Sequence, residues 1–150
     1  MSLPNPRFEE SYGRLFGSDV SVGGMGDEFF AGFYQRFLST PEVSALFAQT
    51  DMERQVQMLK RSLFHLVTYY VTAEPSAELK RIAEIHAHLG VQSNLFDNWL
   101  QALLETVREF DLEADEATEL AWAWALSPGI TYMRLSIPGD FSAWQAETAD

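Results

Sequence analysis

Apolar residues recur every three or four positions along nearly the whole chain, which places them on one face of successive α-helices. The longest apolar stripe lies in the middle of the chain and consists of Met52, Val56, Leu59, Leu63, Val67 and Tyr70. Alternating strand patterns and Asn-Gly or Asp-Gly hairpin signals do not occur in the sequence. The chain is therefore predicted to be all-α, with six or seven helices.

Caps and helix breakers predict where these helices begin and end. Helices are expected over residues 8–16, 27–38, 41–47, 51–71, 75–90 and 91–110, with a last one that Asp115 caps and that runs through Met133. Thr50 and Glu53 have the spacing of a capping box, and Gly90 is expected to end its helix. Residues 17–26 are predicted to be a loop. No internal repeat or linker is visible, so a single domain is expected over 1–150: an N-terminal segment 1–26, a core 27–137 and a tail 138–150.

Composition excludes several classes of protein. Apolar residues make up 47% of the chain, which indicates a well-filled core and excludes disorder. The net charge of −12 makes nucleic acid and anionic membrane surfaces poor partners. The absence of cysteine excludes thiolate haem ligation, c-type haem attachment, iron–sulfur clusters and a cysteine nucleophile. Neither a signal peptide nor a bilayer-spanning segment is visible, so a cytoplasmic protein is expected.

His86 is the polar member of an otherwise apolar helix face, which it shares with Leu79, Ile82 and Leu89. A buried imidazole needs a partner for its ring nitrogens, and a metal ion suits it. For an isolated histidine of this kind, a bond to a backbone carbonyl in the core is the more common arrangement.

Three upstream features favour a ligand site. Tyr34 lies among phenylalanines, Phe47 follows Pro41, and Gln55 lies about 40° around its helix from Leu59. A polar side chain at the edge of a buried face, opposite a histidine on another helix, suggests a flat cavity. Such a cavity would have a ligand on one wall and hydrogen-bond donors on the other.

From about Asp27 to Leu135 the chain resembles the haem globins, and it looks closest to bacterial single-domain globins and the globin domains of oxygen sensors. The resemblance rests on the order and spacing of five motifs: Phe33-Tyr34-x-x-Phe37, Pro41-x-x-x-x-Leu46-Phe47, Gln55-x-x-x-Leu59, Ile85-His86-x-x-x-Gly90-Val91 and the segment from Trp122 to Met133. It implies a globin-like fold around a pocket for haem b, with residues 27–137 as the haem-binding core.

The resemblance also implies residue roles. His86 would ligate the haem iron, Phe47 would pack on the porphyrin, and Tyr34 with Gln55 would form a polar pair facing a bound gas. The remaining pocket residues would be apolar: Leu59 as the distal gatekeeper, with Ile82, Val91, Phe96 and Leu100 lining the cavity. His88 is the rival ligand if the register differs, although its position about 200° from His86 predicts exposure. His65 is expected at the surface, so coordination by two histidines is not expected.

Three functions are compatible with these features. The first is reversible binding of O2, NO or CO by a sensor or scavenger, with exposed Trp and Leu residues on the last two helices serving a second copy or a signalling partner. The second is an NO dioxygenase or weak peroxidase that needs a separate reductase. The third is a haem-free globin-like module in stress signalling, which would have no need of His86.

The sequence departs from flavohaemoglobin-like globins, in which a tyrosine and a glutamate polarise the proximal histidine. The matching tyrosine position is Phe96, and no acidic residue occurs between Glu119 and Asp140. These two differences count against the enzyme.

Overall fold

In the computed structural model, the described residues are 5–17 and 25–137, and they form seven α-helices without a strand. The helices are α1 (Pro6–Phe16), α2 (Met25–Phe37), α3 (Pro41–Leu46), α4 (Met52–Thr72), α5 (Ala77–His88), α6 (Asn94–Phe110) and α7 (Glu116–Leu135). The predicted all-α class and helix number are confirmed for this part of the chain. The predicted tail and most of the predicted 17–26 loop lie outside it. No described helix combines the length and the apolar character needed to cross a membrane.

Side-chain caps explain where the early helices begin. Asn5 caps α1, because its Oδ1 accepts a hydrogen bond from the Phe8 N–H at 3.2 Å. At α4 the predicted Thr50 capping box is wrong. Asp51 is the cap instead, and its Oδ1 accepts from the N–H groups of Glu53 at 3.2 Å and Arg54 at 3.4 Å. A carboxylate satisfies two orphan donors and also suits the positive end of the helix dipole.

The boundaries of α5 and α6 also differ from prediction. Helix α5 begins at Ala77, two residues after the expected start at Pro75, with Ser76 as its cap, and Gly90 has φ +70° just after the helix, as expected of a stop. The next helix begins at Asn94, three residues later than predicted. Residues 91–93 form the connection, and Ser93 Oγ accepts a hydrogen bond from Arg134 Nε of α7 at 2.7 Å. Residues 91–93, whose periodicity looked helical, therefore include a residue that contacts Arg134, 41 residues further along the chain.

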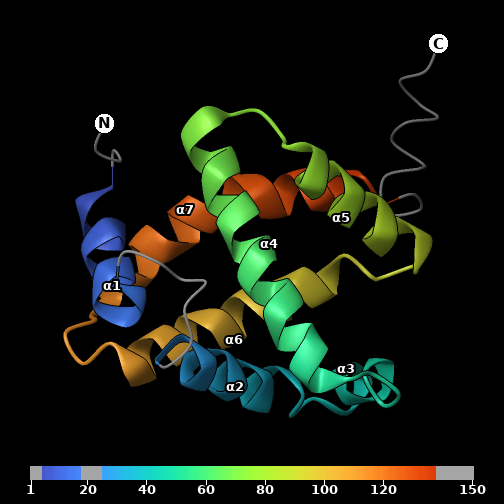
Figure 1. The fold of residues 1–150 in the computed structure, drawn as a ribbon, viewed down its shortest axis with the longest axis horizontal. Helices are drawn as coiled ribbons and strands as arrows, with labels where there is room; N and C mark the ends of the chain where they lie inside the picture. Colours follow the sequence, from blue (N-terminus) through green and yellow to red (C-terminus); the bar gives the residue numbers. More distant parts are fainter. Residues whose placement is uncertain (1–4, 18–24, 138–150) are drawn as a thin grey trace.

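Helix α7 contacts four other helices, α1, α4, α5 and α6. Figure 1 shows α7 passing behind α4, and α4 and α5 diverging from their short connection at residues 73–76. Helix α6 packs mainly against α2 and α7 rather than against α4 or α5. Gln55 lies near the start of α4 and His86 near the end of α5, so both belong to the ends that lie far from the connection.

The crossing of α4 and α7 depends on Gly129. A Cβ at this position would lie 2.5 Å from Leu66 Cδ2, so any larger residue would force the buried Leu66 side chain to shift. The core also contains fully buried aromatic side chains, among them Phe29, Phe30 and Trp122.

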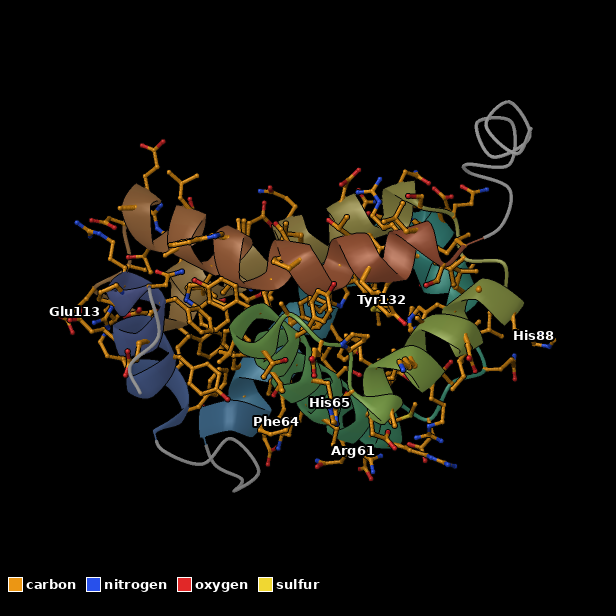
Figure 2. All side chains as sticks on the ribbon, turned by 90° about the horizontal axis from the view of Figure 1, so that it is seen from above. Arg61, Phe64, His65, His88, Glu113 and Tyr132 are labelled. Carbon is orange, nitrogen blue, oxygen red and sulfur yellow. The ribbon has the colours of Figure 1, made fainter. Side chains whose placement is uncertain are left out.

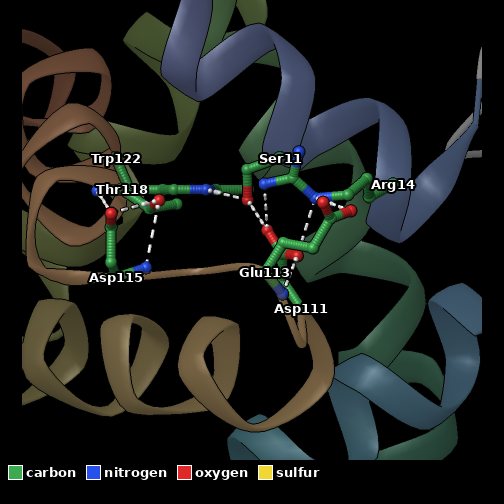
Figure 3. Close-up of polar contacts among 7 residues, drawn as sticks. All are labelled: Ser11, Arg14, Asp111, Glu113, Asp115, Thr118 and Trp122. Atoms are coloured by element: carbon green, nitrogen blue, oxygen red, sulfur yellow. Dashed lines mark hydrogen bonds and ion pairs between the residues drawn. The ribbon is translucent and has the colours of Figure 1, made fainter.

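A buried polar network attaches α1 to the corner between α6 and α7 (Figure 3). Asp111 follows α6 and is only 2% exposed. Its carboxylate accepts from Ser11 Oγ at 2.6 Å and from Arg14 Nε at 2.7 Å. Ser11 Oγ in turn accepts from Trp122 Nε1 at 2.9 Å. Since buried polar atoms are costly without partners, this network fixes the position of α1.

Candidate functional site

His86 is held in an orientation suited to a metal ligand. Its Nδ1 lies 2.8 Å from the carbonyl oxygen of Ile82, one turn earlier on α5. A carbonyl oxygen can only accept, so Nδ1 carries the proton, and Nε2 keeps a free lone pair in the neutral ring. This is the backbone partner expected for a core histidine, but the side chain is half-buried rather than enclosed. The Phe96 ring packs beside it, with ring centroids 5.9 Å apart.

Tyr34 and Gln55 meet on α2 and α4, as predicted. Tyr34 is 6% exposed, and burial raises the pKa of its hydroxyl to about 12, although a side-chain hydrogen bond with Gln55 opposes the increase. The Tyr34 hydroxyl is therefore protonated at every physiological pH. A tyrosine hydroxyl can both donate and accept, and a glutamine amide can do the same, so the two side chains form a polar pair.

Phe47 lies next to this pair. Its ring centroid is 6.2 Å from that of Tyr34 and 6.0 Å from that of Phe37. The side chain is half-buried and follows α3, at the corner before α4. The structure thus brings three of the predicted site residues together from α2, α4 and the turn after α3.

The residues predicted to form the apolar walls of the haem pocket differ in how deeply they are buried. Leu59 and Phe96 are buried, whereas the other predicted wall residues are half-buried although they pack on the core: Phe47, Ile82, Val91 and Leu100. They come from α4, α5, α6 and their connections. Their half-burial leaves part of each of these apolar side chains accessible to solvent.

Exposed apolar side chains at this end of the molecule were missed by the sequence analysis. Met58 on α4 and Ile85 on α5 are 40% and 42% exposed. Leu89 was expected on the buried face, and that prediction is wrong, because Leu89 is 70% exposed at the C-terminal cap of α5. Apolar residues about 100° beside Leu59 and His86 were the signal that could have found Met58 and Ile85.

The two other histidines differ from each other. His88 is exposed, as predicted, and Figure 2 shows it pointing away from the helices at the end of α5. His65 was expected at the surface, and it is half-buried on α4, where its Nδ1 lies 3.0 Å from Ser76 Oγ. Neither histidine lies with Tyr34 and Gln55.

The residues present suit haem. A neutral imidazole with a free Nε2 is the donor that haem iron takes in globins and peroxidases. Apolar walls with few polar groups are what a porphyrin-sized ligand needs, and the exposed Met58, Ile85 and Leu89 are side chains that such a ligand would cover.

The chain matches no protein-family model and no curated protein. It does match a crystal structure of a protein from Pseudomonas aeruginosa PAO1 that is described as structurally highly homologous to a human hemoglobin. The two chains share 32% sequence identity with a TM-score of 0.75, and the match covers 88% of this chain and 96% of that one. This chain therefore has a globin-like fold and belongs to the same family as the Pseudomonas protein.

Proposed function

We propose that this chain is a b-type haem protein that reversibly binds O2 or another diatomic gas, as a sensor or scavenger of the kind found among bacterial single-domain globins and oxygen-sensor domains. One observation carries the proposal. The Nδ1 of His86 is occupied by the Ile82 carbonyl, so Nε2 is available for iron, while Tyr34 and Gln55 form a linked polar pair on other helices.

Each side chain then has a defined task. When bound, haem would supply a ferrous iron with one axial position left for a diatomic gas. His86 would hold the iron, Phe47 would pack on the ring, and the Tyr34 hydroxyl would donate a hydrogen bond to the gas. Gln55 would keep that hydroxyl oriented.

Titration of the purified chain with hemin tests the proposal. The expected result is a Soret absorbance band that saturates at one haem per chain and shifts when CO is added to the reduced protein. A titration that does not saturate at one haem per chain would instead support the alternative of a haem-free globin-like interaction module.

Replacing Tyr34 by phenylalanine is expected to speed O2 dissociation by about 10-fold, because one hydrogen bond contributes up to about 1.5 kcal/mol and about 1.4 kcal/mol corresponds to a factor of ten. CO accepts hydrogen bonds poorly, so its dissociation rate should change much less. Stopped-flow measurements of both gases provide the comparison. Tyr132→Phe is the matched control, since Tyr132 lies on α7 against Tyr69. Equal effects on O2 and CO would mean that Tyr34 acts only by packing.

The alternative of an NO dioxygenase has one observation in its favour, which is the Tyr34–Gln55 pair, because such a pair would also suit that enzyme. Two contacts weaken it: the partner of His86 is a neutral backbone carbonyl, and its neighbouring ring is Phe96. Neither polarises the imidazole as a carboxylate would. With NO, O2 and an external reductase, nitrate formation is therefore expected to stay below about 10 turnovers per second, a typical enzymatic rate. Sustained turnover above that rate would support the dioxygenase.

A sensor also needs a surface that passes its state to another molecule. Exposed apolar side chains lie on one face of α7, namely Leu120, Trp124 and Leu135. They agree with the expectation of a second copy or a signalling partner at the last two helices.

A further inference from the structure

The cap of α5 is shared between two helices. Ser76 Oγ accepts the Leu79 N–H at 3.0 Å, which caps α5, and the same oxygen lies 3.0 Å from Nδ1 of His65 on α4. A serine hydroxyl has one donor and two acceptor positions. With the His65 proton on Nε2, Ser76 can donate to Nδ1 and still accept from Leu79. The Ser76 hydroxyl can therefore make both contacts at once, as a donor to His65 and as an acceptor from Leu79.

This contact lies at the connection from which α4 and α5 diverge (Figure 1). The preceding turn contains Ala73 with φ +59°, a conformation that alanine rarely adopts and that surrounding contacts must hold. Figure 2 shows His65 beside Phe64 and Arg61 on α4. The His65–Ser76 contact thus joins a side chain within α4 to the residue that caps α5.

A small rotation about this point would move His86 considerably. His86 lies ten residues after Ser76, which is about 15 Å along a helix. A tilt of about 4° at the cap therefore displaces the imidazole by about 1 Å. Binding constellations need their groups held to within about 0.5 Å. The orientation of α5 at Ser76 consequently controls where His86 lies relative to Tyr34 and Gln55.

We propose that His65 is a positioning residue, which fixes the α5 cap to α4 and thereby sets the position of His86 in the pocket. The proposal rests on the haem-binding function proposed above. His65 itself touches neither the haem nor the gas. It acts through Ser76 and the N-terminal turn of α5.

His65→Ala and His65→Asn are the informative pair. Asparagine offers an oxygen near the place of Nδ1, whereas alanine offers no acceptor. Alanine is the better helix former of the two, so helix propensity alone would make the alanine variant the more ordered one. If His65 positions α5, the asparagine variant should instead be the more ordered one, because asparagine restores the acceptor for Ser76 that the alanine variant lacks. His88→Asn is the matched control, because His88 is exposed on the same helix as His86.

Two measurements separate this proposal from the function on which it rests. In the haem-free protein, hydrogen exchange of the Leu79 amide should be about 3-fold faster in His65→Ala and about 5-fold faster in Ser76→Ala, but nearly unchanged in His65→Asn. In the haem-loaded protein, the iron–histidine stretching band should shift or broaden in the first two variants only. If wild type binds no haem, the amide exchange still tests the cap. If the Leu79 amide and the stretching band are the same in His65→Ala as in wild type, His65 does not position α5.

Discussion

His86→Ala is expected to abolish haem retention. The variant loses the imidazole whose Nε2 is left available by the 2.8 Å bond between Nδ1 and the Ile82 carbonyl. Loss of a partner behind a metal ligand typically weakens metal binding by 10- to 100-fold. Loss of the ligand itself should therefore weaken haem binding by more than about 100-fold. Haem transfer to an acceptor apoprotein, followed by absorbance, measures the effect.

His88→Ala is the control for this experiment, because His88 lies two residues further along the chain and is exposed. Its spectrum and haem transfer rate should equal those of wild type. Added free imidazole should partly restore the absorbance bands of His86→Ala, since the substitution leaves space where the ring was. Loss of haem in His88→Ala alone would show that the register was misassigned.

Features that depend on local periodicity were accessible from the sequence. Helix number and the apolar stripe around Leu59 depend on residues three, four or seven positions apart. The exposure of His88 follows from the same geometry. The resemblance then connected these separate helices into one site, and the Pseudomonas structure confirms the fold on which that site depends.

Features that depend on contacts between distant segments could not be read in this way. Ser93, just before α6, contacts an arginine of α7, and His65 contacts the serine that caps α5, and neither contact is visible in a local sequence pattern. The choice of Asp51 over Thr50 is a local competition that two adjacent capping residues leave open. Leu89 matched the periodicity but lies where α5 ends, so no neighbouring helix covers it.

The role of Asp111 could not be predicted from the sequence, because its partners Ser11 and Arg14 lie about 100 residues away. The Asp111 side chain is 1% exposed and the Arg14 side chain 31%. Arg14 binds it through two donors, with Nη2 2.9 Å from the second carboxylate oxygen, and the Glu113 N–H adds a bond at 3.1 Å. A bidentate pair of this kind is the strong form of an ion pair.

Asp111→Ala is expected to lower the free energy of unfolding by about 3 kcal/mol. Removing one member of a buried pair typically costs about 3–5 kcal/mol, and the partial exposure of Arg14 places this case at the lower end. Ser11 also loses its acceptor. Asp97→Ala is the matched control: Asp97 pairs with Arg134 at 2.8 Å, but its side chain is 68% exposed, so a loss of less than about 1 kcal/mol is expected. Urea denaturation followed by circular dichroism measures both.

The pH dependence of this difference distinguishes the charge from packing. Burial alone would raise the pKa of Asp111, but the hydrogen bonds from Arg14, Ser11 and the Glu113 N–H outweigh it and hold that pKa below the ordinary value. A lowered folded-state pKa means that the stabilisation is complete above the unfolded-state pKa of about 4 and disappears as the pH falls through the folded-state value. The stability gap between wild type and Asp111→Ala should thus be constant from about pH 5 to 8 and narrow below about pH 4. A gap that stays constant below pH 4 would mean that Asp111 stabilises the α1 attachment by shape, and the ion pair with Arg14 would contribute nothing.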